Sequence, residues 1–147
     1  MPNTYTQIYI QIIFAVQDRR SLITKKYRDE LEKYMCGIIL NKKSKPLAIY
    51  CNPDHTHILI GLHPTISISS MARDIKANSS KWIMGKFSCQ EGFGAFSYSR
   101  SQIDSVIKYI LNQPEHHKKK SFKDEYMKFL EKFEIEYNDK YLFNWIQ

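Results

Sequence analysis

The succession of apolar periodicities along the chain predicts an α+β fold of the ferredoxin-like type, in which helices cover one face of an antiparallel sheet and leave the other face for a ligand. Three observations support this prediction: a strand-like alternation near the N-terminus, two adjacent strand-like runs after the first helical pattern, and a short aromatic run between two later helical patterns. In chain order they give βαββαβ, followed by further helix. A chain of 147 residues can bury its own core. We therefore expect a single domain over residues 1–147, with a core at about 5–117 and a C-terminal helix and tail at about 118–147.

The first half of the chain contains three predicted strands and one helix. Residues 6–17 alternate polar and apolar side chains and then close with an apolar run, which predicts a strand with one buried face. Residues 24–40 carry apolar side chains at helical spacing, with Thr24 as the N-cap. Residues 46–51 and 55–62 read as two strands separated by a short turn, so we expect them to form an antiparallel hairpin.

The second half contains one more strand between helices. Residues 67–87 carry an interrupted apolar stripe that predicts a helix, and residues 95–98 read as a short strand. A third helix is predicted at about 101–114, with Ser101 as its N-cap and its end near Pro114. Residues 122–133 predict a further helix, and the aromatic tail at 141–145 is expected to dock against the rest of the chain.

The charge balance favours a polyanionic partner. Lysine and arginine number 22 against 15 aspartates and glutamates, which gives a net charge of +7 and a pI of about 9.3. Nucleic acid is favoured over a membrane surface because no strongly basic amphipathic helix is evident. The run Lys118-Lys119-Lys120 taken alone fits a solvated surface better than a binding site.

Cysteine usage and hydropathy predict a soluble, cytoplasmic protein. Cys36, Cys51 and Cys89 are odd in number and lack metal-binding or redox spacing, which favours reduced thiols. No apolar run reaches the ~18 residues expected of a membrane span. The first residues also lack the charged region and apolar run of a secretory signal.

The segment His55-Thr56-His57 predicts a pair of imidazoles on one face of a strand. Two imidazoles held in this way on a rigid element suit a metal ion. A His-x-His pair is a weak signal by itself, and the alternative is that both side chains are partly exposed and bind nothing.

A second candidate pair lies on the predicted third helix. Tyr109 and Gln113 are four residues apart, so a phenol and an amide would point the same way. The alternative from periodicity alone is that Tyr109 is a half-buried core residue and Gln113 an ordinary surface residue of the helix.

Four segments of the chain, at 9–14, 53–57, 80–82 and 106–113, resemble the single-tyrosine HUH transposases of the insertion-sequence-200/605 type, the superfamily that includes the REP-associated tyrosine transposases. The resemblance covers nearly the whole chain. It implies that His55, His57 and Gln113 hold a divalent metal, Mg²⁺ or Mn²⁺, and that Tyr109 is the nucleophile. If Gln113 did not bind the metal, His116 and His117 would be the next candidates.

One position departs from the family pattern. Thr56 stands where the family usually has a bulky hydrophobic residue. Because neighbouring side chains of a strand alternate, we expect Thr56 to face the packed side of the sheet, away from the metal. The change is therefore expected to adjust packing and to leave the metal site in place.

The resemblance also implies a reaction and its partners. Single-stranded DNA would be cleaved to leave a 5′-phosphotyrosine link and a free 3′-hydroxyl, and another 3′-hydroxyl would then rejoin the strands. The family works as a homodimer and recognises hairpins near the ends of mobile elements. Residues expected to contact the DNA are Lys76, Ser79, Ser80, Lys81, Arg100 and Lys108. The run at 118–120 is a further candidate for phosphate contacts, and Tyr98 or Phe93 could stack on a base.

Two other functions fit the same sequence. A non-catalytic module could bind single-stranded nucleic acid on a ferredoxin-like sheet through aromatic residues and positive charge, without metal or cleavage. A domesticated transposase relative could keep the chemistry and recognise dispersed repeats without moving itself. A covalent DNA adduct separates the first alternative from a transposase, and element ends flanking the gene would separate the second.

Overall fold

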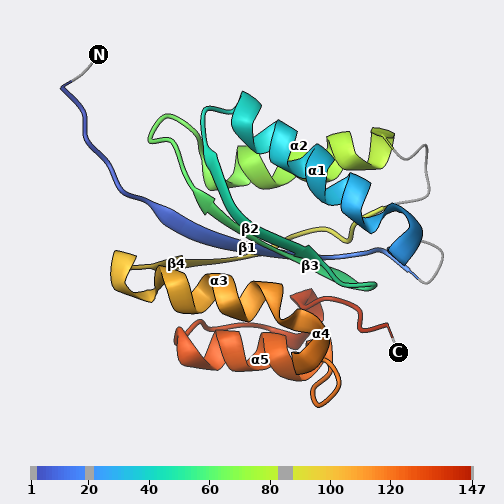
Figure 1. Ribbon diagram of the computed structural model, residues 1–147. Helices are drawn as coiled ribbons and strands as arrows, with labels where there is room; N and C mark the ends of the chain where they lie inside the picture. The colour runs from blue at the N-terminus through green and yellow to red at the C-terminus, as the bar shows by residue number, and fades with distance from the viewer. Residues whose placement is uncertain (1–2, 19–21, 83–87, 147) are drawn as a thin grey trace.

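The computed structural model describes residues 3–18, 22–82 and 88–146. Its centre is one antiparallel sheet with the strand order β2-β3-β1-β4 (Figure 1). The strands are β1 (Tyr9–Ala15), β2 (Lys45–Cys51), β3 (His55–Gly61) and β4 (Gly94–Tyr98). The helices are α1 (Lys25–Asn41), α2 (Ile68–Trp82), α3 (Ile103–Leu111), α4 (Gln113–His116) and α5 (Phe122–Lys132).

One face of the sheet packs against α1 and α2. The alternation of β1 sends Ile12 and Phe14 to this face, where they join the fully buried Leu31 and Met35 of α1 and Ile75 of α2 in the largest core cluster. Both helices lie on the same side in Figure 1. The sequence order and the layer arrangement confirm the predicted ferredoxin-like α+β fold.

The opposite face of the sheet, which we expected to be open to a ligand, is covered by the C-terminal helices α3, α4 and α5 (Figure 1). Leu59 of β3 packs with Ile103 and Ile110 of α3, so the apolar stripe of α3 packs against the sheet. Ile13 and Phe96 pack with an aromatic group from α5 and the tail: Phe122, Tyr126 and Phe143. The tail therefore docks as predicted, beside α5.

The predicted boundaries of the strands and helices hold with local shifts. Thr24 occupies the N-cap of α1, as predicted, without a capping side-chain hydrogen bond. The third helix begins after a 3₁₀ turn at Arg100–Gln102. Ser99 is the N-cap of that turn and Gln102 is the N-cap of α3, so the predicted cap at Ser101 is wrong. The helix α3 ends at Leu111, three residues before Pro114, which belongs to the short helix α4. The last five residues of the predicted helix at 67–87 lie outside the described residues.

Gly94, at the start of β4, allows α5 to approach the sheet. A Cβ at this position would lie 2.5 Å from the hydroxyl oxygen of Tyr126 and 2.8 Å from a carbon of its ring. Any larger residue would therefore push Tyr126, and with it α5, away from β4. Among the helices that the structure describes, none is long and apolar enough to cross a lipid bilayer.

Candidate active site

Strand β3 directs two imidazoles toward the helices on the second face of the sheet. His55 and His57 are buried, and His57 pairs in register with Ile13, whose side chain belongs to the cluster under α5. Thr56 pairs with Phe14 and so points toward α1 and α2, as expected from the alternation of a strand. The histidine pair therefore lies in the interior, between β3 and the C-terminal helices.

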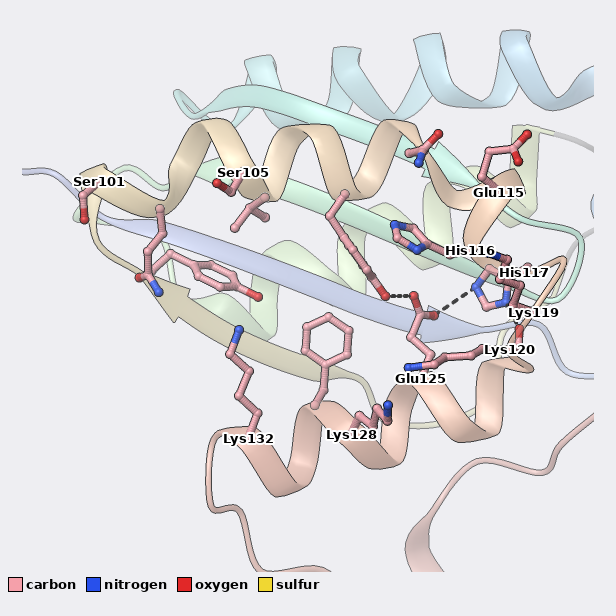
Figure 2. Close-up of a pocket in the computed structure, with 16 residues that line it drawn as sticks. Ser101, Ser105, Glu115, His116, His117, Lys119, Lys120, Glu125, Lys128 and Lys132 are labelled. Atoms are coloured by element: carbon pink, nitrogen blue, oxygen red, sulfur yellow. Dashed lines mark hydrogen bonds and ion pairs between the residues drawn. The ribbon is translucent and has the colours of Figure 1, made fainter.

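Three imidazoles converge on one carboxylate oxygen. The Nε2 atoms of His55, His57 and His117 each lie 3.1 Å from Oε1 of Glu125. Figure 2 shows the contact between His117, which follows α4, and Glu125, which lies on α5. Glu125 is only 5% exposed, so its charge is compensated by these rings and not by water.

Tyr109 and Gln113 reach the other oxygen of the same carboxylate. The Tyr109 hydroxyl donates a short hydrogen bond to Oε2 of Glu125, and Gln113 Nε2 donates to Oε2 at 3.0 Å. Gln113 Oε1 accepts from Asn52 Nδ2 at 2.9 Å. The two residues come from consecutive helices, α3 and α4, and still share one site. The structure thus brings Tyr109, Gln113 and the histidine pair together within a single chain.

Outer partners orient the two imidazoles of β3. His55 Nδ1 lies 2.7 Å from Asp54 Oδ1, and Gln11 Nε2 lies 2.8 Å from His57 Nδ1. With the Nδ1 atoms engaged in this way, both Nε2 atoms face the centre of the site. Partners of this kind fix the ring orientation of metal-binding histidines. The ring of Phe122 stacks on His55 with centroids 3.8 Å apart and covers the site from the side of α5.

The charges of the site are strongly coupled. Burial raises the pKa of Glu125, but hydrogen bonds to His117, His55 and His57 outweigh it and hold that pKa far below the usual glutamate range. Burial and the adjacent Glu125 carboxylate raise the pKa of Tyr109 above its ordinary value. Burial lowers the pKa of His57. Glu125 is therefore an anion, and Tyr109 is a neutral phenol that donates its proton to it.

The donor set fits a divalent metal ion. One donor atom from each of His55, His57, His117 and Glu125 lies within 4.8 Å of the others. Metal bonds of about 2.0–2.2 Å to nitrogen and carboxylate oxygen would need only small side-chain rotations from this arrangement. Three imidazole nitrogens and one anionic oxygen suit a transition-metal ion, and the carboxylate also makes Mg²⁺ acceptable.

A cavity of about 760 Å³ opens beside this group, between α3 and α5 (Figure 2). Tyr109 lines it from α3, and Glu125 and Phe129 line it from α5. A substrate entering the cavity would meet the phenol of Tyr109 directly. The site therefore combines a buried group that could hold a metal ion, a phenol, and access from outside.

Four of the six predicted DNA contacts lie on the other side of the sheet. Lys76, Ser79, Ser80 and Lys81 belong to α2, which packs on the face opposite α3 (Figure 1). Lys76 Nζ donates to the backbone carbonyls of Gln90 and Gly92 at 3.0 and 2.6 Å. Ser79 is fully buried, Ser80 Oγ donates to the carbonyl of Lys76, and Lys81 is exposed.

Arg100 and Lys108 also lie outside the cavity beside Tyr109. Arg100 is 4.0 Å from Asp104 and borders a separate hollow with His63 and Ile107. Lys108 is exposed on α3, next to Tyr109 in sequence but not among the residues that line the cavity. None of the six residues is brought together with the phenol, and their contact with DNA stays a prediction.

Glu125 is the site residue that sequence reasoning missed. Its signal was present: within the predicted helix at 122–133, the apolar stripe of Phe122, Tyr126 and Phe129 includes Glu125 at helical spacing. A carboxylate on the buried face of an amphipathic helix requires a cationic or hydrogen-bonding partner. The partner could not be named, because it depends on how α5 packs against β3.

Comparisons with known proteins identify the fold and the family. No curated protein matches the chain. Among solved structures, the chain is similar to a candidate transposase from Deinococcus radiodurans R1, with 18% identity, a TM-score of 0.61 and coverage of 77% of this chain and 95% of that one.

A second similar structure is a REP-associated tyrosine transposase bound to a REP hairpin, with 18% identity, a TM-score of 0.63 and coverage of 80% of this chain and 73% of that one. At this identity, both likenesses concern the fold. The family model described as "Transposase IS200 like" matches residues 4–113, which is most of the chain and includes the two histidines of β3, Tyr109 and Gln113. The chain therefore belongs to the family of IS200-like transposases.

Proposed function

We propose that this transposase cleaves and rejoins single-stranded DNA through a covalent 5′-phosphotyrosine link on Tyr109. The observation that supports this most strongly is the position of the Tyr109 hydroxyl, which opens on the cavity and donates to Glu125, the same carboxylate that contacts three imidazoles. The proposed nucleophile and the three imidazoles that could bind a metal thus all contact the Glu125 side chain, which can also accept the phenol proton.

The chemistry follows from these positions. A phosphodiester resists attack because its oxygens are already negative, and a divalent ion bound at the histidines supplies charge neutralisation there. Before the attack Tyr109 keeps its proton and donates it in a hydrogen bond to Glu125 Oε2. As Tyr109 Oη bonds to phosphorus, that proton passes to Glu125. The bond from phosphorus to the 3′-oxygen breaks, so the 5′-phosphate is transferred to tyrosine and the 3′-oxygen takes up the proton and leaves as a hydroxyl. The phosphotyrosine bond conserves the energy of the cleaved bond, so rejoining requires no nucleotide cofactor.

The metal ligands we propose are His55, His57 and Gln113. We add His117 and Glu125, because their donor atoms lie within 4.8 Å of those of the two histidines on β3. Gln113 Oε1 lies 3.0 Å from His117 Nε2, so the amide is at the edge of the same donor group. Mg²⁺ and Mn²⁺ both bind carboxylate and amide oxygens, and a site with three imidazoles favours Mn²⁺.

We also propose that the chain acts as one domain, in the cytoplasm, as a homodimer that binds hairpin DNA at element ends. A hairpin is bound to one of the structurally similar transposases. The free cysteines Cys36, Cys51 and Cys89 are consistent with a reducing compartment. Within one chain, the rings of Tyr109 and His57 are already 6.0 Å apart, so the proposed dimer does not need to exchange its tyrosine helices.

The experiment that tests the function uses labelled single-stranded hairpin DNA from the flanks of the gene, incubated with Mn²⁺ or with chelator and separated on a denaturing gel. Wild type is expected to give a protein-linked DNA band in Mn²⁺, and Tyr109→Phe none. Tyr141→Phe is the matched control, since Tyr141 is 77% exposed and does not line the cavity beside Tyr109. Binding of DNA by wild type in Mn²⁺ without any linked band would overturn the proposal in favour of a binding module.

A further inference from the structure

The cavity beside Tyr109 has one strongly basic wall. Four lysines line it from the loop before α5 and from α5 itself: Lys119, Lys120, Lys128 and Lys132. Figure 2 shows Lys128 and Lys132 rising from α5 on the side of the cavity, with Lys119 and Lys120 beyond Glu125. All four side chains are exposed. We refer to these four residues as the lysine wall.

The positive charge of the lysine wall is only partly offset by neighbouring acids, since Asp124 and Glu125 attract Lys120 without forming a salt bridge with it. Among the residues that the structure describes, no salt bridge joins a carboxylate to any of the four lysines, and the two acids that line the cavity are engaged elsewhere. Glu115 pairs with Lys118 at 3.1 Å, and Glu125 is held by the imidazoles. Contact with Lys128 lowers the pKa of Lys120, which indicates that the two ammonium groups repel each other. An anion between them would relieve that repulsion.

The rest of the cavity is uncharged and partly aromatic. Ser101 and Ser105 line it from the side of α3, and the rings of Tyr98, Tyr109 and Phe129 form its apolar part. Hydroxyl groups and lysines can contact phosphates, and aromatic rings can stack on unpaired bases. A duplex keeps its bases paired and cannot present them to rings in this way. The combination therefore fits a single strand better than a double-stranded one.

We propose that the lysine wall binds the phosphates of the single-stranded DNA segment adjacent to the bond that is cleaved. This inference rests on the proposed function, because Tyr109 defines where that bond lies. It assigns strand binding to α5 and the loop before it. Lys128 and Lys132 are one helical turn apart, about 6 Å along the axis, so they can contact successive parts of one backbone.

The test is equilibrium binding of a fluorescent single-stranded oligonucleotide in chelator, where no cleavage interferes, across a range of salt concentrations. The double variant Lys128→Ala/Lys132→Ala is expected to bind about tenfold more weakly at moderate salt. Its slope of log affinity against log salt is expected to fall by about 1.4, since each lost phosphate contact on a single strand contributes about 0.7.

The matched control is Lys25→Ala/Lys26→Ala, which removes the same charge from exposed positions of α1 on the far side of the sheet. It is expected to leave both affinity and slope close to wild type. Lys128→Arg/Lys132→Arg keeps the charge and is expected to restore binding. Duplex DNA of the same sequence should compete poorly for wild type.

The outcomes separate this inference from the proposed function. If wild type forms the Tyr109 adduct in Mn²⁺ but the alanine variant and the α1 control bind equally well, the lysine wall does not hold the strand. If the alanine variant loses binding while wild type forms no adduct, the wall binds DNA and the transposase chemistry is wrong. Equal affinity of wild type for duplex and single strand would also overturn the inference.

Discussion

Glu125 hydrogen-bonds the hydroxyl of Tyr109 with one carboxylate oxygen and places the other oxygen 3.1 Å from the Nε2 atom of His57. The nucleophile we propose and the candidate metal ligands are thus linked through a single side chain on α5. The link lies within one chain, and it depends on the packing of α5 against the sheet.

Glu125→Gln tests this link. The substitution keeps the shape but removes the charge that the three imidazoles compensate, so in chelator we expect the free energy of unfolding to fall by about 3 kcal/mol. We also expect Mn²⁺ to raise the melting temperature of wild type more than that of the variant, since a weaker ligand gives less stabilisation by binding. Glu131→Gln, at an exposed position of α5, is the control. Equal stabilisation of both variants by Mn²⁺ would show that Glu125 is not a ligand.

His117→Asn tests the third imidazole. Because His117 Nε2 shares the Glu125 oxygen with the pair on β3, its loss is expected to weaken Mn²⁺ binding by about tenfold or more. Titration calorimetry measures this directly, without DNA. His63→Asn is the control, since His63 is bonded to Thr65 near the surface. An unchanged affinity in His117→Asn would exclude His117 and leave the pair on β3, Gln113 and Glu125 as the candidate ligands.

Mixing two inactive variants tests where the site is assembled. Tyr109→Phe and His57→Ala each lack one part of the site, and a dimer that exchanged tyrosine helices would regain one intact site when the two are mixed. Because Tyr109 meets His57 of its own chain, we expect the mixture to form no DNA adduct. Adduct formation by the mixture, measured on the gel described above, would show exchange between subunits.

Gly94→Ala tests the approach of α5 to β4. The new methyl group would collide with Tyr126, and we expect a loss of about 1–3 kcal/mol in the free energy of unfolding, measured by urea denaturation. Gly37→Ala is a matched control in α1, where a Cβ meets nothing within 4 Å. There the same change should stabilise the protein by about 0.5–1 kcal/mol. Equal effects at the two positions would contradict the close packing of Tyr126.

Local patterns were sufficient to predict much of the fold. The alternation of a strand determines that His55 and His57 share a face and that Thr56 does not, whatever packs around them. The helix at 24–40 and the hairpin that follows were also predicted, since their periodicity and turn residues act over short distances.

The parts that could not be predicted depend on tertiary packing. A helical stripe shows which side of a helix is buried but not which face of the sheet it covers, so Lys76 and Lys81 on α2 could not be separated from Tyr109 by sequence alone. For the same reason, Glu125 was recognisable as a carboxylate on an apolar stripe, but its contact with the histidines arises only when α5 meets β3 across 70 residues of chain.

The match to the family ends at Gln113, whereas His117, Glu125 and the lysine wall all follow it. A chain shortened to that point would keep every residue by which the family is matched. It would nevertheless leave the phenol of Tyr109 without its hydrogen-bond acceptor and expose Ile13 and Phe96 to water. The last quarter of the sequence therefore completes the active site that we propose, and exchanging it between relatives offers a way to test DNA preference while the sheet and its histidines stay the same.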